Sequence, residues 1–226
     1  MHRPIHCQFH DVIHKNSERI LYMNLVFLAS LIVFIIFLSV RLKRQSKVQQ
    51  ENEKSFWERE RMANSVRKKP LDNLSYIHIP LETFPTHILP EDETVLECIG
   101  LIESLTSQKI VNLTGFSNTD LKLEYGTANI TVLTEYDQNY TLLVRTLQKW
   151  ADVLIAAGYV KEASILMEFA VSTRTDISRT YYQLAEYYVS QRESEKIQWL
   201  KDTADGLRSS NRNSIMNRLK EMYPDI

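Results

Sequence analysis

Histidine is the residue type that most directly suggests chemistry in this sequence. Four histidines recur at every fourth position near the start of the chain: His2, His6, His10 and His14. If this segment is helical from about Ile5, His6, His10 and His14 lie on one face, where imidazole groups can share a soft or borderline metal ion. No neighbouring residue stands out as a group that would orient these ligands. A metal site is therefore the alternative hypothesis here, and a solvated histidine-rich segment is the leading one.

The start of translation bears directly on this alternative. Met23 could also begin a normal anchored chain, and a start there would remove all four histidines. Mass spectrometry of the native N-terminus separates the two cases. A metal-responsive or metal-handling membrane protein remains a hypothesis only if translation begins at Met1.

Residues with other catalytic potential are scattered without a recognisable spacing. The chain has five glycines, and they form no loop of the kind that cradles phosphate. The paired-histidine helix motif of zinc proteases is absent as well. Carboxylates are numerous, but nothing singles out two of them as a general acid and a general base. The sequence therefore predicts neither an enzyme nor a cofactor.

A membrane anchor is the clearest feature of the chain. Ile20–Val40 has no charged residue, and as a helix it would extend about 31 Å, close to the thickness of a bilayer core. A lone segment in hydrocarbon must satisfy its own backbone groups, which favours a helix. Basic residues follow it, instead of the small residues of a cleavage site, so we expect a retained single-pass anchor. The excess of basic residues on this side predicts that the C-terminal domain is cytoplasmic: Arg41, Lys43, Arg44 and Lys47.

Charge is unevenly distributed along the chain. Residues 1–70 contain 13 Lys/Arg and 6 Asp/Glu, a balance of +7, whereas residues 71–226 contain 14 Lys/Arg and 22 Asp/Glu, a balance of −8. A basic stem suits anionic lipid headgroups. An acidic domain argues against nucleic acid as a partner, because phosphate binding needs a basic face. Cys7 and Cys98 lie on opposite sides of the expected anchor, so we expect no disulfide between them.

The sequence divides into five regions that differ in composition. The regions are a histidine-rich segment at 1–19, the transmembrane helix at 20–40, a basic helical stalk at 41–69 that Pro70 ends, a proline-rich strap with a packing helix at 70–130, and a helical domain at 131–226. In the fourth region Ile77, Ile79 and Leu81 alternate with other residues, which predicts an extended strap. An amphipathic packing helix is predicted to follow at 91–106, and its apolar stripe includes Cys98. The predicted fold class is therefore mainly α.

Consecutive helices fill the last region, and they repeat at a regular interval. Their apolar periodicity predicts helices at about 135–157, 160–172, 177–191, 193–207 and 214–222. A shift of about 34 residues aligns Trp150 with Leu184, Ala151 with Ala185, and Ala170 with Ala204. This interval matches the period of about 34 residues that is typical of one class of repeat proteins built from paired helices.

The first helix pair resembles a tetratricopeptide repeat. The family's order of large, small and turn residues is matched by Trp150, Ala151, Leu154, Gly158, Tyr159, Ala163, Phe169 and Ala170. The second pair departs from the pattern, since Arg192 replaces the turn glycine, Ile197 takes a small position, and Thr175 and Ser209 stand where proline often closes a repeat. The resemblance covers about residues 144–211 plus a capping helix. It implies two repeats whose open N-terminal end is closed by the 91–106 helix and the strap; a generic bundle of helical hairpins is the alternative.

The resemblance also implies a binding groove lined by the first helix of each pair. The residues carried over to it are Arg145, Gln148, Asp152, Arg179, Tyr182 and Glu186. They place a basic stripe beside an acidic one, with Tyr182 as an aromatic anchor. Asp152 and Glu186 replace the asparagines with which the family's best-known clamp holds an acidic peptide terminus, so that ligand is not expected here. The acidic net charge of the domain favours a basic partner by long-range attraction.

The sequence thus predicts a bacterial-type, single-pass membrane protein whose helical domain recruits a protein or peptide partner to the membrane. Two alternatives remain open beside metal handling. The charged residues of the groove could form an ordinary solvated face, and the chain could be a structural subunit of a membrane complex.

Overall fold

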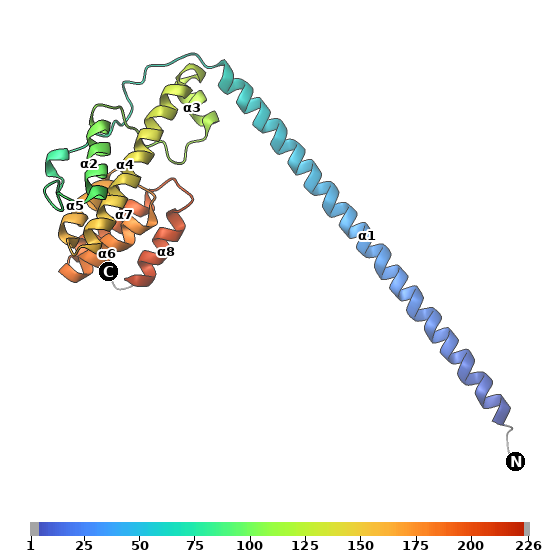
Figure 1. Ribbon diagram of the computed structural model, residues 1–226. Coiled ribbons are helices and arrows are strands. Elements are labelled where there is room, and N and C mark those ends of the chain that lie inside the picture. Colours follow the sequence, from blue (N-terminus) through green and yellow to red (C-terminus); the bar gives the residue numbers. More distant parts are fainter. Residues whose placement is uncertain (1–4, 224–226) are drawn as a thin grey trace. The chain divides into compact units, whose positions relative to one another are not determined.

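The computed structural model describes the backbone of residues 5–223 and the side chains from Phe27 to Tyr223 (Figure 1). Within these residues the protein is mainly helical, as expected, with eight α-helices and two short 3₁₀ helices. The chain divides into two compact units, one that ends at Arg61 and one that starts at Met62. The second unit contains all of the hydrophobic core described below.

Helix α1 (Ile5–Ser65) runs without interruption through the expected anchor and stalk. It ends at Ser65, and the expectation that it continues to Pro70 is wrong. The reason is tertiary. The backbone N–H of Lys69 donates to the carbonyl of Tyr125 at 3.0 Å, and the side-chain amide of Asn129 donates to the Lys69 carbonyl at 2.8 Å. Residues 66–69 are therefore held by a distant segment and leave the helix.

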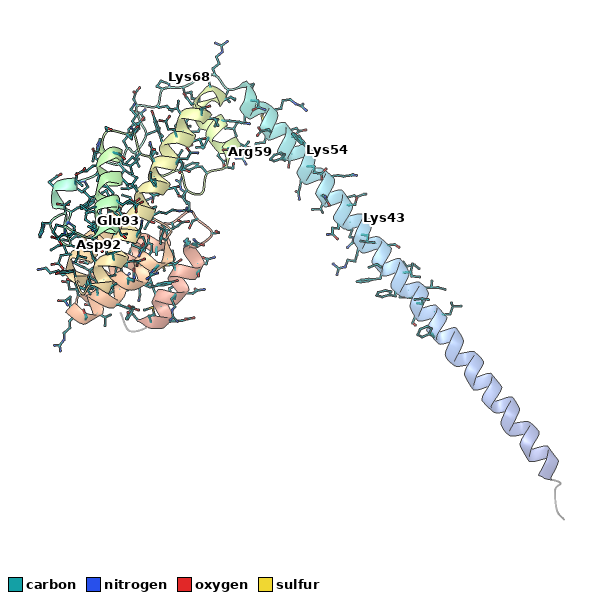
Figure 2. The ribbon with its side chains drawn as sticks, in the orientation of Figure 1. Lys43, Lys54, Arg59, Lys68, Asp92 and Glu93 are labelled. Atoms are coloured by element: carbon teal, nitrogen blue, oxygen red, sulfur yellow. The ribbon has the colours of Figure 1, made fainter. Side chains whose placement is uncertain are left out.

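The side chains of α1 from Phe27 to Val40 are all exposed. Figure 2 shows basic side chains farther along the same helix, among them Lys43, Lys54 and Arg59. Among the residues whose side chains are described, no helix is long and apolar enough to cross a membrane. The expected span at 20–40 lies partly outside these residues, as do the histidines at positions 2, 6, 10 and 14.

The predicted strap is present as an extended segment on the surface of the second unit. Tyr76 forms an isolated antiparallel bridge with Val111, and the Ile77 N–H donates to the Ile110 carbonyl at 2.9 Å. Ile77 and Ile79 are half-buried against the core, whereas His78 between them is exposed. A short 3₁₀ helix, η1 (Leu81–Thr83), follows.

The predicted packing helix is α2 (Glu93–Thr106). The Asp92 carboxylate caps it by accepting a hydrogen bond from the Val95 N–H at 3.0 Å. Figure 2 labels Asp92 and Glu93 at this end. The apolar stripe of α2 packs on α4, and Cys98 within it is fully buried. Burial raises the pKa of the Cys98 thiol, so this cysteine acts as a small apolar side chain, as expected.

A second, smaller core lies near the start of the domain, and the sequence did not indicate it. It gathers side chains from the strap, the 107–117 loop, α3 (Asn118–Tyr125) and the beginning of α4: Leu74, Val111, Leu113, Leu121 and Leu133. Helix α3 starts with a capping box between Ser117 and Asp120 and ends at Gly126, which has a φ of 89°. A Cβ at Gly126 would overlap the carbonyl oxygen of Arg67, so glycine is required there. The 3₁₀ helix η2 (Thr127–Asn129) leads into α4.

Five helices complete the domain: α4 (Ile130–Ala156), α5 (Val160–Ser172), α6 (Ser178–Gln191), α7 (Ser194–Asp205) and α8 (Arg212–Met222). Figure 1 shows them folding back and forth beside one another, and each packs on the next. Ala151 on α4 and Ala163 on α5 are fully buried, and side chains this small allow packed helices to approach closely. Helix α4 begins at Ile130, earlier than the periodicity indicated, whereas α5 matches its predicted bounds.

The α4–α5 and α6–α7 turns share one backbone conformation. Gly158 has a φ of 89°, and Arg192, at the corresponding place after α6, has a φ of 61°. Both residues therefore end a helix in the left-handed region, which a non-glycine residue occupies only at an energetic cost. Arginine replaces the expected glycine in the sequence, but the turn itself is retained.

We expect Gly158→Ala to destabilise the domain by about 1 kcal/mol, because an L-residue is strained at this φ. Apart from residue 158 itself and its two chain neighbours, no described atom lies within 4 Å of the added methyl group, so steric overlap with the rest of the domain contributes nothing. The matched control is Gly206→Ala, where φ is −78° and alanine fits; it should be neutral or slightly stabilising. Urea unfolding of the full chain in a non-ionic detergent measures both. An equal effect of the two substitutions would show that the left-handed turn is not required.

Candidate functional site

The structure brings three of the six predicted groove residues together where α4 meets α6. Gln148 and Asp152 come from α4 and Arg179 comes from the start of α6. Arg179 Nε lies 3.1 Å from Asp152 Oδ1, and Gln148 Nε2 donates to the same oxygen at 2.9 Å. The basic stripe and the acidic stripe therefore meet and neutralise each other at this point.

Two residues that the sequence did not single out complete this polar cluster. The Gln183 amide donates to Asp152 Oδ1 at 3.0 Å and accepts from Gln148 Nε2 at 2.7 Å. The Thr180 hydroxyl donates to Gln148 Oε1 at 2.5 Å. Both residues stand beside the buried Tyr181 and Leu184 on α6, and this placement of polar groups next to the apolar stripe was the available signal. We call the five residues Gln148, Asp152, Arg179, Thr180 and Gln183 the α4–α6 cluster.

Burial makes the α4–α6 cluster a structural element as well as a charged surface. Gln148 is 9% exposed and Thr180 is 1% exposed. Buried polar groups of this kind are costly unless each has a hydrogen-bond partner, and here the amide and the hydroxyl satisfy each other. Most of the Arg179 side chain is exposed, at 64%, so its ion pair is screened by solvent.

The other three predicted groove residues lie apart from this cluster. Arg145 is exposed on α4 and Glu186 is exposed on α6. Tyr182 is half-buried on the core, and its hydroxyl donates to the Ser214 carbonyl near the start of α8 at the long distance of 3.5 Å. Tyr182 therefore packs against α8, and the exposed charges of this face are carried by Arg145, Arg179 and Glu186.

A cavity of about 550 Å³ lies elsewhere in the domain, where four loops converge. Its walls are the strap at 74–77, the loop at 111–116, the α5–α6 corner at 172–174 and the α7–α8 corner at 206–209. We call it the corner pocket. The sequence alone did not indicate this pocket, because its walls come from segments that are widely separated in the chain, the first at Leu74 and the last at Ser209.

No family model matches the chain, and comparisons with curated proteins and with solved structures find no match. Among the described residues, no group of His, Cys, Asp and Glu side chains could hold a metal ion.

We expect Gln148 and Thr180 to be energetically coupled. Thr180→Val removes one donor and should cost about 1 kcal/mol, and Gln148→Ala should cost about 1–3 kcal/mol because it leaves the Thr180 hydroxyl buried without its partner. The double variant should fall short of the sum by about 0.5–3 kcal/mol. Denaturant unfolding gives all three values, with the exposed Arg145→Ala within about 0.5 kcal/mol of wild type as the control. Strict additivity would mean that the contact contributes nothing.

Proposed function

We propose that this protein is a single-pass membrane protein whose tetratricopeptide-like domain recruits a protein partner to the membrane. The observation that carries the proposal is the combination, in one chain, of an uncharged 20–40 segment with a repeated pair of packed helices. Helix α5 begins at Val160 and α7 at Ser194, a spacing that matches the period of about 34 residues in this repeat class. Repeated helix pairs of this length stack into surfaces that bind other proteins.

Support for the anchor comes from the exposed apolar side chains of α1. Between Phe27 and Val40 the exposed large apolar residues include Phe34 at 59%, Ile36 at 59% and Phe37 at 57%. A continuous apolar surface of this kind is unfavourable in water and marks contact with a membrane or another protein. The basic residues at 41–47 favour a cytoplasmic location for the second unit.

Support for partner binding comes from the charged face of α4 and α6. Arg145 and Glu186 are exposed and have no ion-pair partner among the described residues. Residues 71–226 carry a net charge of −8, which attracts a basic partner over a long range. The exposed carboxylate of Glu186 then contacts Lys or Arg of the partner, and Arg145 contacts carboxylates or backbone carbonyls.

The anchor is tested by two arginines in the middle of the apolar run. Each arginine at the centre of a transmembrane helix costs about 2.5–3.5 kcal/mol on insertion scales, so Leu31→Arg with Ile35→Arg should release the protein from membranes into alkaline carbonate extracts. Arginines at Val48 and Phe56, which lie beyond the basic residues on the same helix, are the matched control and should leave the protein in the membrane pellet. Retention of the 31/35 variant in the pellet would contradict the anchor.

The partner face is tested by charge reversal, because Tyr182 also packs on α8 and its removal would disturb the fold. Arg145→Glu with Glu186→Lys should reduce recovery of a crosslinked partner from membranes, and should weaken binding of the identified partner by about tenfold, mainly through slower association. Lys161→Glu with Glu195→Lys reverses two exposed charges on α5 and α7 and should leave binding unchanged. Equal binding by both pairs, with unchanged helicity, would place the partner elsewhere.

A further inference from the structure

We propose that the corner pocket binds a small anionic ligand that carries a phosphate or carboxylate group on an apolar body. Its volume of about 550 Å³ falls within the range of about 300–1,000 Å³ that is usual for small-molecule sites. The pocket is separate from the α4–α6 cluster, so this inference stands independently of partner recruitment.

The electrostatics of the pocket are opposite to those of the domain. Arg174 and Arg208 line it, and none of the described lining residues is Asp or Glu, although residues 71–226 carry a net charge of −8. Neither guanidinium group forms an ion pair with a described carboxylate. The Arg208 guanidinium instead lies over the ring of Phe116, 4.6 Å from its centroid. Arginine guanidinium groups are planar donors that bind carboxylate and phosphate in bidentate fashion, and both of these arginines are exposed to solvent at the pocket.

The two arginines occupy equivalent corners of the repeated helix pairs. Arg174 follows α5 and Arg208 follows α7, so one period of the repeat, about 34 residues, separates them. Stacking of the second pair on the first therefore places both corners at one cavity. The pairing of the two charges results from the repeat, and not from proximity in the sequence.

The walls of the pocket are held in place without a ligand. The Asn112 amide donates to the carbonyls of Thr173 and Arg174 at 2.9 and 3.1 Å, and its oxygen accepts from the Thr114 N–H at 2.9 Å. Gly115 has a φ of 87°, and a Cβ on it would lie 2.8 Å from the Arg208 carbonyl oxygen. These contacts join the 111–116 loop to both corners. A preformed site of this kind loses little conformational entropy when it binds a ligand.

The remaining lining residues define the rest of the ligand. Hydroxyl groups of Ser75, Thr114 and Ser209 can donate to an anionic oxygen, whereas Leu74 and Phe116 provide apolar surface. A ligand with a charged head and an apolar or aromatic body matches both parts. The head can belong to a free metabolite or to a lipid headgroup, and its chemistry is the same in the two cases.

Calorimetric titration of the full chain in a non-ionic detergent tests the proposal, with phenyl phosphate and benzoate as anionic probes and phenol as their uncharged counterpart. At least one anion should bind saturably, and phenol should not. Arg174→Gln and Arg208→Gln should each weaken binding by about tenfold or more, as expected for a lost charge-assisted hydrogen bond. Arg192→Gln, an exposed arginine at the α6–α7 turn, is the control and should bind as wild type does.

A measurement on the wild-type chain locates the site without substitutions that could disturb folding. Phenyl phosphate should protect Arg174 and Arg208 from modification by phenylglyoxal, read by mass spectrometry, while the exposed Arg192 stays reactive. Short-chain phosphatidic acid added to the micelles identifies the source: displacement of phenyl phosphate indicates a lipid headgroup, and no displacement indicates a soluble anion. Absence of saturable binding by either anion, equal binding of phenol, or equal protection of Arg192 would overturn the proposal.

Discussion

Burial of α4 is the constraint on which the rest of the second unit depends. Leu133 near its start belongs to the smaller core, and Trp150 and Leu154 near its end are fully buried in the larger one. The helix packs on α2 and α3 as well as on α5. A long amphipathic helix that supplies both cores ties the strap, the loops and the helix pairs to a single element.

Helix α4 also holds the loops that form the corner pocket. The Tyr140 hydroxyl donates to the Thr173 carbonyl at 3.2 Å, and the Asp137 carboxylate accepts from the Leu113 N–H at 3.1 Å. Burial raises the pKa of the Asp137 carboxyl, although the Leu113 N–H opposes this effect by stabilising the carboxylate. Because this carboxyl holds a proton more tightly in the folded state than in the unfolded state, its contribution to stability is lost as the pH rises through its titration range.

The hydrogen bonds of Tyr140 and Asp137 couple the geometry of the pocket to the packing of the core through one helix, α4.

The two candidate surfaces differ in how much of their charge is available. At the α4–α6 cluster, Asp152 contacts the side chains of Gln148, Gln183 and Arg179, so its charge is largely used internally. At the corner pocket, Arg174 and Arg208 line a cavity whose described walls include no acidic residue. Exposed charges such as Arg145 and Glu186 suit a protein partner bound at the rim of an interface, whereas two arginines that line one cavity suit a small anion.

The sequence by itself predicted most of the helices and their order along the chain. Apolar periodicity located α2, α5 and α6 to within two residues, because helical hydrogen bonds join residues four apart and their signals are local. It also identified Cys98 as a buried residue. Only the tertiary structure decided where α1 ends, that Arg179 pairs with Asp152, that Tyr182 packs on α8, and that a cavity opens between two arginine corners. These features depend on contacts such as that of Asn112 with Thr173, 61 residues away, and no local pattern specifies which distant groups will meet.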